Sequence, residues 1–146
     1  MAVQEVDFRT DVDDCIDYAC RLLRKAYRQG ARVQVTAPRE VLSQLDRALW
    51  VFEERDFLPH VRMPGSSADV AARTPIWLSP QAGGEGAPTV LLNLGAETPA
   101  DVSAIDRLIE VVGTSAEEVL AGRARWRAYQ AAGLKPKRNG DDPARA

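Results

Sequence analysis

The sequence has few of the residues that most often build metal sites, disulfides or nucleophilic active sites, with only two cysteines and one histidine among 146 residues. Cys15 and Cys20 lie five positions apart in one helical pattern, which is too close for a disulfide framework and indicates a reducing compartment. They also fall on different faces of a helix, which disfavours a two-cysteine metal clamp. His60 alone excludes a histidine-rich metal site, and we expect it to be structural or exposed.

Phosphate-binding motifs and long apolar runs are also missing. No Gly-x-Gly-x-x-Gly follows the first expected strand and no Gly-Lys-Ser/Thr occurs, so nucleotide binding lacks its usual signature and we expect no cofactor. Gly83, Gly84 and Gly86 are interpreted as part of a linker. No stretch approaches the roughly 20 apolar residues of a membrane span, and residues 1–7 lack a basic region followed by an apolar run. We therefore expect a cytoplasmic protein.

What is present is the composition and periodicity of one α/β domain. Hydrophobic residues make up 45% of the chain and charged residues 27%, which is ordinary for a globular protein. Periodicities typical of strands and of helices alternate along it. The expected elements are a strand over residues 3–8, a helix capped within 10–14 and ending by Gly30, a strand over 32–36, a helix from 38 to about 51, strands over 76–78, 90–92 and 106–112, and a helix from the capping boxes at Thr114 and Ser115 to Gly133.

Two parts of this pattern are less defined. Residues 53–74 contain prolines, glycine and serines, and we expect a loop with only short structure there. The link over residues 80–88 is too short for a helical crossover, so the direction of the strand within 89–94 stays open.

Charge is divided unevenly along the chain. Residues 1–120 carry 12 Lys and Arg against 19 Asp and Glu, whereas residues 121–146 carry 7 against 2. The overall net charge of −2 argues against a general nucleic-acid binder, but the C-terminal part is strongly basic. We expect the basic residues between 121 and 138, which we call the cationic run, to form a cationic surface; they are Arg123, Arg125, Arg127, Lys135, Lys137 and Arg138.

The last expected helix combines part of this charge with an aromatic side chain. Arg123, Trp126, Arg127 and Gln130 recur at three- and four-residue spacing, so guanidinium groups flank an indole. Guanidinium groups bind carboxylates through paired hydrogen bonds, and the indole offers an apolar wall. This combination suits an acidic peptide that ends in a hydrophobic residue. The alternative is a solvated helix with its tryptophan in the core.

Two aspartates offer the best enzymatic alternative. Asp11-Val12-Asp13 follows the first expected strand and resembles the acid pair of haloacid-dehalogenase-type phosphatases, in which one Asp attacks phosphorus and the other handles the proton. The residues around the pair depart from that motif, and helix capping is the simpler interpretation.

Three segments together resemble a known family. They are Leu45-Asp46-Arg47-Ala48-Leu49-Trp50, Phe57-Leu58-Pro59-His60 and the stretch from Arg123 to Gly133. In this order and spacing they resemble the chi subunit of bacterial DNA polymerase III, over residues 3–134. The resemblance implies a single-domain, open Rossmann-like twisted α/β sheet, mostly parallel, with helices on both faces. It places one chi-like domain at residues 1–134 and leaves 135–146 as a basic, disordered C-terminal tail.

The resemblance also implies a function without catalysis. Proteins of this family join the clamp loader through the psi subunit and bind the acidic C-terminal tail of single-stranded-DNA-binding protein, so contact with DNA is indirect. Arg123, Trp126 and Arg127, with Gln130 beside them, fall where the family binds that tail, although Trp126 replaces a tyrosine and Arg127 a lysine. Trp50 and Phe57 match the region that meets psi, with the core as an equal alternative for Trp50.

Overall fold

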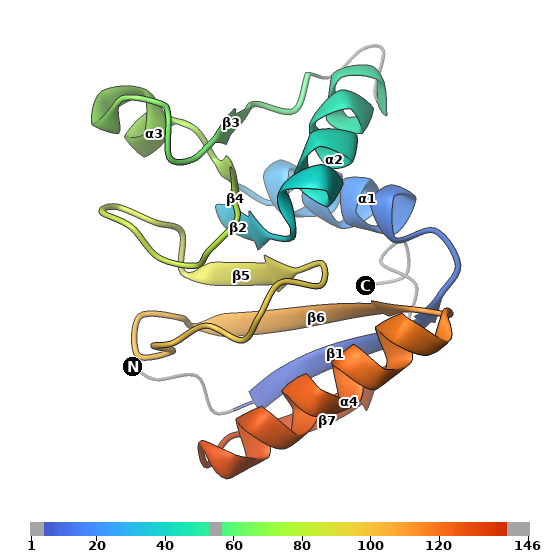
Figure 1. Ribbon diagram of the computed structural model, residues 1–146. Helices are drawn as coiled ribbons and strands as arrows, with labels where there is room; N and C mark the ends of the chain where they lie inside the picture. Colours follow the sequence, from blue (N-terminus) through green and yellow to red (C-terminus); the bar gives the residue numbers. More distant parts are fainter. Residues whose placement is uncertain (1–4, 53–56, 140–146) are drawn as a thin grey trace.

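The computed structural model describes residues 5–52 and 57–139, and it shows an open twisted sheet of seven parallel strands with four helices (Figure 1). The expected α/β class is therefore confirmed. The elements are β1 (Glu5–Val12), α1 (Cys15–Arg28), β2 (Val33–Thr36), α2 (Arg39–Phe52), β3 (His60–Arg62), α3 (Ala68–Arg73), β4 (Ile76–Ser79), β5 (Val90–Asn93), β6 (Arg107–Gly113), α4 (Ala116–Ala131) and β7 (Lys135–Asn139).

The strands lie in the order β3-β4-β2-β5-β6-β1-β7. The open question about the strand near residue 90 is settled, because β5 runs parallel to both β2 and β6. β2 separates β4 from β5, so the link that contains Gly83, Gly84 and Gly86 has to cross β2, and the backbone of Gly83 exchanges two hydrogen bonds with the Gln34 side chain of that strand. The segment expected to hold only short structure contains β3 and α3.

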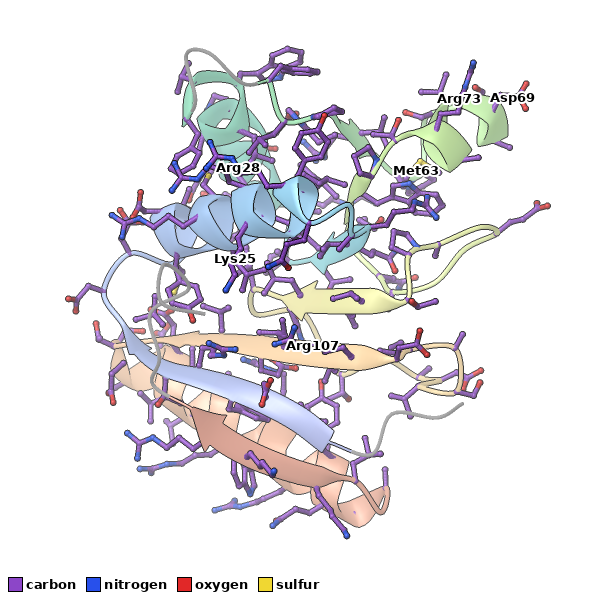
Figure 2. All side chains as sticks on the ribbon, turned by 180° about the vertical axis from the view of Figure 1, so that it is seen from behind. Lys25, Arg28, Met63, Asp69, Arg73 and Arg107 are labelled. Carbon is purple, nitrogen blue, oxygen red and sulfur yellow. The ribbon has the colours of Figure 1, made fainter. Side chains whose placement is uncertain are left out.

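Both faces of the sheet are covered, which explains why the central strands β2, β4 and β5 are buried at nearly every residue. Consecutive residues of a strand point to opposite faces. On β6, Ile109 packs into the core beneath α1 and α2, whereas Leu108 packs into the core beneath α4. Figure 2 shows the face that α1 and α2 cover, with α1 and its Lys25 and Arg28 toward the viewer and α4 behind β1 and β7.

Local capping fixes where the helices start. The carboxylate of Asp14 accepts a hydrogen bond of 3.0 Å from the backbone N–H of Asp17, within the expected capping segment of α1. At α4, Ser115 accepts from the N–H of Glu118 at 3.1 Å and donates to the Glu118 carboxylate at 2.9 Å. Of the two expected capping boxes, the one at Ser115 thus begins the helix.

The end of the chain departs from the expectation. Residues 135–139, predicted to belong to a disordered tail, form strand β7 and pair in parallel with β1. That part of the prediction is wrong. The backbone of β1 supplies a hydrogen-bonding partner for residues 135–139, and the basic, proline-containing sequence of these residues gives no local sign of that pairing. Residues 140–146 lie outside the described residues. Within 5–52 and 57–139, no helix is long and apolar enough to cross a membrane.

Gly122 lets α4 lie close against β6. A Cβ atom at Gly122 would lie 2.9 Å from Cγ2 of Val112, closer than carbon atoms pack. We expect Gly122→Ala to lower the free energy of unfolding, because overpacking costs about 1–3 kcal/mol. That cost outweighs the roughly 1 kcal/mol by which alanine stabilises a helix relative to glycine. Urea denaturation followed by circular dichroism measures this. In a Val112→Ala background the cost should shrink, and an equal cost in both backgrounds would contradict the contact.

Candidate functional site

Helix α4 presents the four residues predicted to bind an acidic peptide on one surface. Arg123, Arg127 and Gln130 are exposed, and Trp126 is half-buried. The Trp126 ring packs on Phe8 of β1, with centroids 5.0 Å apart and planes tilted by 57°. The indole is therefore held by the core at one side and reachable at the other, which favours the peptide-site interpretation over a tryptophan sealed in the core.

An open pocket of about 270 Å³, called here the α4 pocket, lies between this helix and the sheet. Phe8, Val112 and Val119 give it an apolar lining, and Trp126 forms part of its wall. Arg123 brings one guanidinium to it. Arg127 and Gln130 are on the exposed helix surface and do not line the pocket. The lining residues are Phe8, Thr10, Asp11, Val112, Gly113, Val119, Gly122, Arg123, Trp126 and Arg138.

Arg138, which was predicted to belong to the disordered tail, brings a second guanidinium to the α4 pocket. Its Nε donates to the Thr10 hydroxyl and its Nη2 to the Asp11 carboxylate, both at 2.8 Å. Arg138 is the register partner of Phe8 across the β1–β7 ladder, so both side chains share the α4 face. Only the β1–β7 pairing brings Arg138 to the site, and no local sequence pattern indicates that pairing.

Arg125 is the member of the cationic run that the structure removes from the surface. It is buried, and its Nε donates to Oε1 of Glu110 at 2.9 Å. Asn93 donates to Oε2 of Glu110 at 2.9 Å, and the hydroxyl of Tyr129 donates to the same oxygen. The expectation that all six residues form a cationic surface is therefore wrong at this position, since Arg125 faces the sheet.

Burial dominates the protonation equilibria of this network. It raises the pKa of Glu110 above the usual range, and the charge of Arg125 with the hydrogen bonds from Tyr129 and Asn93 acts in the opposite direction. Burial, followed by the nearby Glu110, also raises the pKa of Tyr129. The phenol therefore stays a hydrogen-bond donor at neutral pH, which ties α4 to β6.

Trp50 and Phe57 form the second predicted surface, called here the aromatic patch. The Trp50 side chain is 60% exposed and the Phe57 side chain 52%, so neither lies in the core. Their ring centroids are 5.1 Å apart with planes tilted by 30°, within the separation at which aromatic pairs interact favourably. Two stacked aromatic rings in water are the kind of exposed apolar feature that marks a docking site.

His60 holds the aromatic patch in place. Its Nε2 lies 2.8 Å from Oδ1 of Asp46 and its Nδ1 lies 2.7 Å from the carbonyl oxygen of Leu58. The imidazole meets the Trp50 ring edge-on, with centroids 5.2 Å apart. The structural role expected for His60 is confirmed, and the Leu-Asp-x-x-Leu-Trp and Phe-x-Pro-His segments prove to be one assembly.

The two aspartates of the enzymatic alternative, Asp11 and Asp13, do not face a common site. Asp11 lines the α4 pocket and pairs with Arg138, while Asp13 lines a different pocket beside Cys15. Asp11 lies within β1, which is longer than expected, at a register shift where its φ of 59° is left-handed. The two carboxylates therefore do not converge on one phosphorus atom, as the phosphatase motif requires.

The two thiols lack the character of reactive nucleophiles, and the acids of the part of the chain described form no metal centre. Burial, followed by the charge of Glu118, raises the pKa of Cys15 to about 11, and burial raises that of Cys20 to about 12. Both therefore stay protonated at neutral pH, whereas a reactive cysteine is a thiolate. No group of three or more His, Cys, Asp or Glu is placed to hold a metal ion among the described residues.

Comparisons with known proteins match most of the chain to one family. The family model for the DNA polymerase III chi subunit, HolC, matches residues 3–137. A curated relative from Pseudomonas aeruginosa, DNA polymerase III subunit chi, is 34% identical over 124 residues, which cover 81% of this chain and 80% of the relative. The matched range contains the aromatic patch and all four residues predicted on α4.

Proposed function

Because this chain belongs to the DNA polymerase III chi-subunit family, we propose that it is a non-catalytic adaptor of the replisome. One surface binds the acidic C-terminal tail of single-stranded-DNA-binding protein, and another binds a psi subunit that connects it to the clamp loader. Its association with DNA is indirect, through these partners. The adaptor works in the cytoplasm, at replisomes on the nucleoid.

The α4 pocket is the observation that carries the first half of this proposal. It combines an apolar lining, an aromatic wall at Trp126 and the guanidinium of Arg123. A hydrophobic side chain at the end of the tail fits the apolar lining, while acidic residues of the tail meet Arg123 and the exposed Arg127. Since the charges are exposed, attraction speeds the encounter and weakens as salt rises.

The aromatic patch supports the second half. It lies on α2 and the segment that leads into β3, whereas α4 packs near the other edge of the sheet (Figure 1). Separate surfaces allow the two partners to be held at once. A large aromatic pair, fixed by Asp46 and His60, is the type of anchor on which protein interfaces depend most.

Charge reversal on α4 tests the proposal. We expect Arg123→Glu, and more strongly Arg123→Glu with Arg127→Glu, to weaken binding of a labelled acidic tail peptide by at least about tenfold, because each change removes a charged hydrogen-bond donor and adds repulsion. Fluorescence anisotropy at low and high salt measures the affinity. Arg73→Glu is the matched control, since Arg73 lies on α3 beyond the opposite edge of the sheet (Figure 2). Unchanged affinity in the double variant would remove this site assignment.

A further inference from the structure

The rim of the α4 pocket carries an ion pair that stands where an acidic ligand would bind. Arg138 and Asp11 join at 2.8 Å, and their side chains are 67% and 74% exposed. Both side chains line the pocket, and they carry opposite charges. The family match ends at residue 137, so Arg138 lies just beyond it.

We infer that Arg138 is a further anchoring residue for an acidic chain end in this pocket, and that Asp11 occupies its guanidinium until such a ligand arrives. The inference rests on the proposed function and deepens it. A carboxylate of the bound chain end takes the place of the Asp11 carboxylate on Arg138, so the pocket exchanges an internal partner for an external one.

Three observations support this exchange. The first is position, because Arg138 shares the α4 face with Phe8 and lines the same pocket as Trp126. The second is the weakness of the internal pair, since exposed ion pairs contribute little and are easily replaced. The third is charge complementarity, because Arg123 and Arg138 together offer two guanidinium forks beside an apolar lining.

The backbone at Asp11 has an unusual conformation. Its φ of 59° places it in a region that few residues other than glycine, asparagine and aspartate adopt, at the register shift of β1. The Asp11 side chain lines the pocket there and pairs with Arg138. Asn tolerates the same conformation, so Asp11→Asn removes the charge and leaves the backbone in place.

A thermodynamic cycle tests the inference with the same labelled acidic tail peptide. We expect Arg138→Gln to weaken binding about fivefold or more, and Asp11→Asn to tighten it about two- to fivefold, because the guanidinium is released. In the Arg138→Gln background, Asp11→Asn should change the affinity little. Lys135→Gln is the control, since Lys135 is exposed on the same strand but points to the opposite face. Thermal unfolding of each variant verifies that β7 stays paired.

The outcomes separate the two levels of the proposal. If Arg138→Gln binds like the wild type while Arg123→Glu binds weakly, the inference about Arg138 fails and the proposed function stands. If neither change matters, the peptide site itself fails. If Asp11→Asn tightens binding equally with and without Arg138, Asp11 acts only by repulsion, and the exchange is overturned.

Discussion

Replacing Arg125 with alanine is expected to lower the free energy of unfolding by about 3–5 kcal/mol, because it leaves the buried carboxyl group of Glu110 without its charged partner. Glu110 is fully buried in β6, and Arg125 is only 8% exposed. Tyr129 and Asn93 would remain as donors to the carboxyl group, but neither carries a charge. A buried group that loses part of its hydrogen bonding also bears its desolvation cost.

Arg127 provides a matched control for this experiment. It lies two residues further along α4 and is exposed, so Arg127→Ala should change the free energy of unfolding by at most about 0.5 kcal/mol. Urea denaturation followed by far-ultraviolet circular dichroism measures both variants. Equal stabilities for the two would mean that the Arg125–Glu110 pair contributes nothing specific, and the account of α4 docking would need revision.

Truncating Trp50 is expected to weaken binding of a psi subunit by about 2–4 kcal/mol, which corresponds to roughly 30-fold or more in the dissociation constant. The indole is mostly exposed in the chain and stacks on Phe57, so a partner that covers the aromatic patch buries a large apolar area. Phe57→Ala should weaken binding in the same direction, and the two effects should not add, because the rings contact each other.

The fold of the variant is not expected to suffer, since an exposed side chain contributes little to the core. Leu120→Ala is the control: Leu120 is 64% exposed on α4, and its truncation should leave psi binding unchanged. Isothermal titration calorimetry with purified psi measures the affinities. Full affinity for both Trp50→Ala and Phe57→Ala would show that psi docks elsewhere.

Much of the fold follows from local signals in the sequence. The strands around residues 76–79 and 90–93 are mainly apolar runs between breakers, and the strand at 33–36 alternates apolar and polar residues. The helices begin at polar caps such as Asp14 and Ser115. These signals depend on neighbours in the chain, so they can be recognised from one sequence. The direction of β5 and the existence of β7 depend on partners far away in the chain, and no local pattern carries that information.

The candidate site was predictable in part for the same reason. Arg123 and Trp126 are one turn apart on one helix, and helical spacing brings them together. Arg125 was misplaced because arginine is usually exposed. A signal was present in its partner: Glu110 is an acid in the middle of an apolar strand, and such a residue requires a buried cation or donor nearby.

The placement of β1 has a consequence for how the chain folds as it is made. Both of its neighbours in the sheet, β6 and β7, come from the last third of the chain. Contacts between distant parts of a chain form slowly because a long loop must close first. β1 therefore has no ladder partner until β6 and β7 have been synthesised, so the part of the sheet built on β1 closes only after the rest of the sheet has left the ribosome.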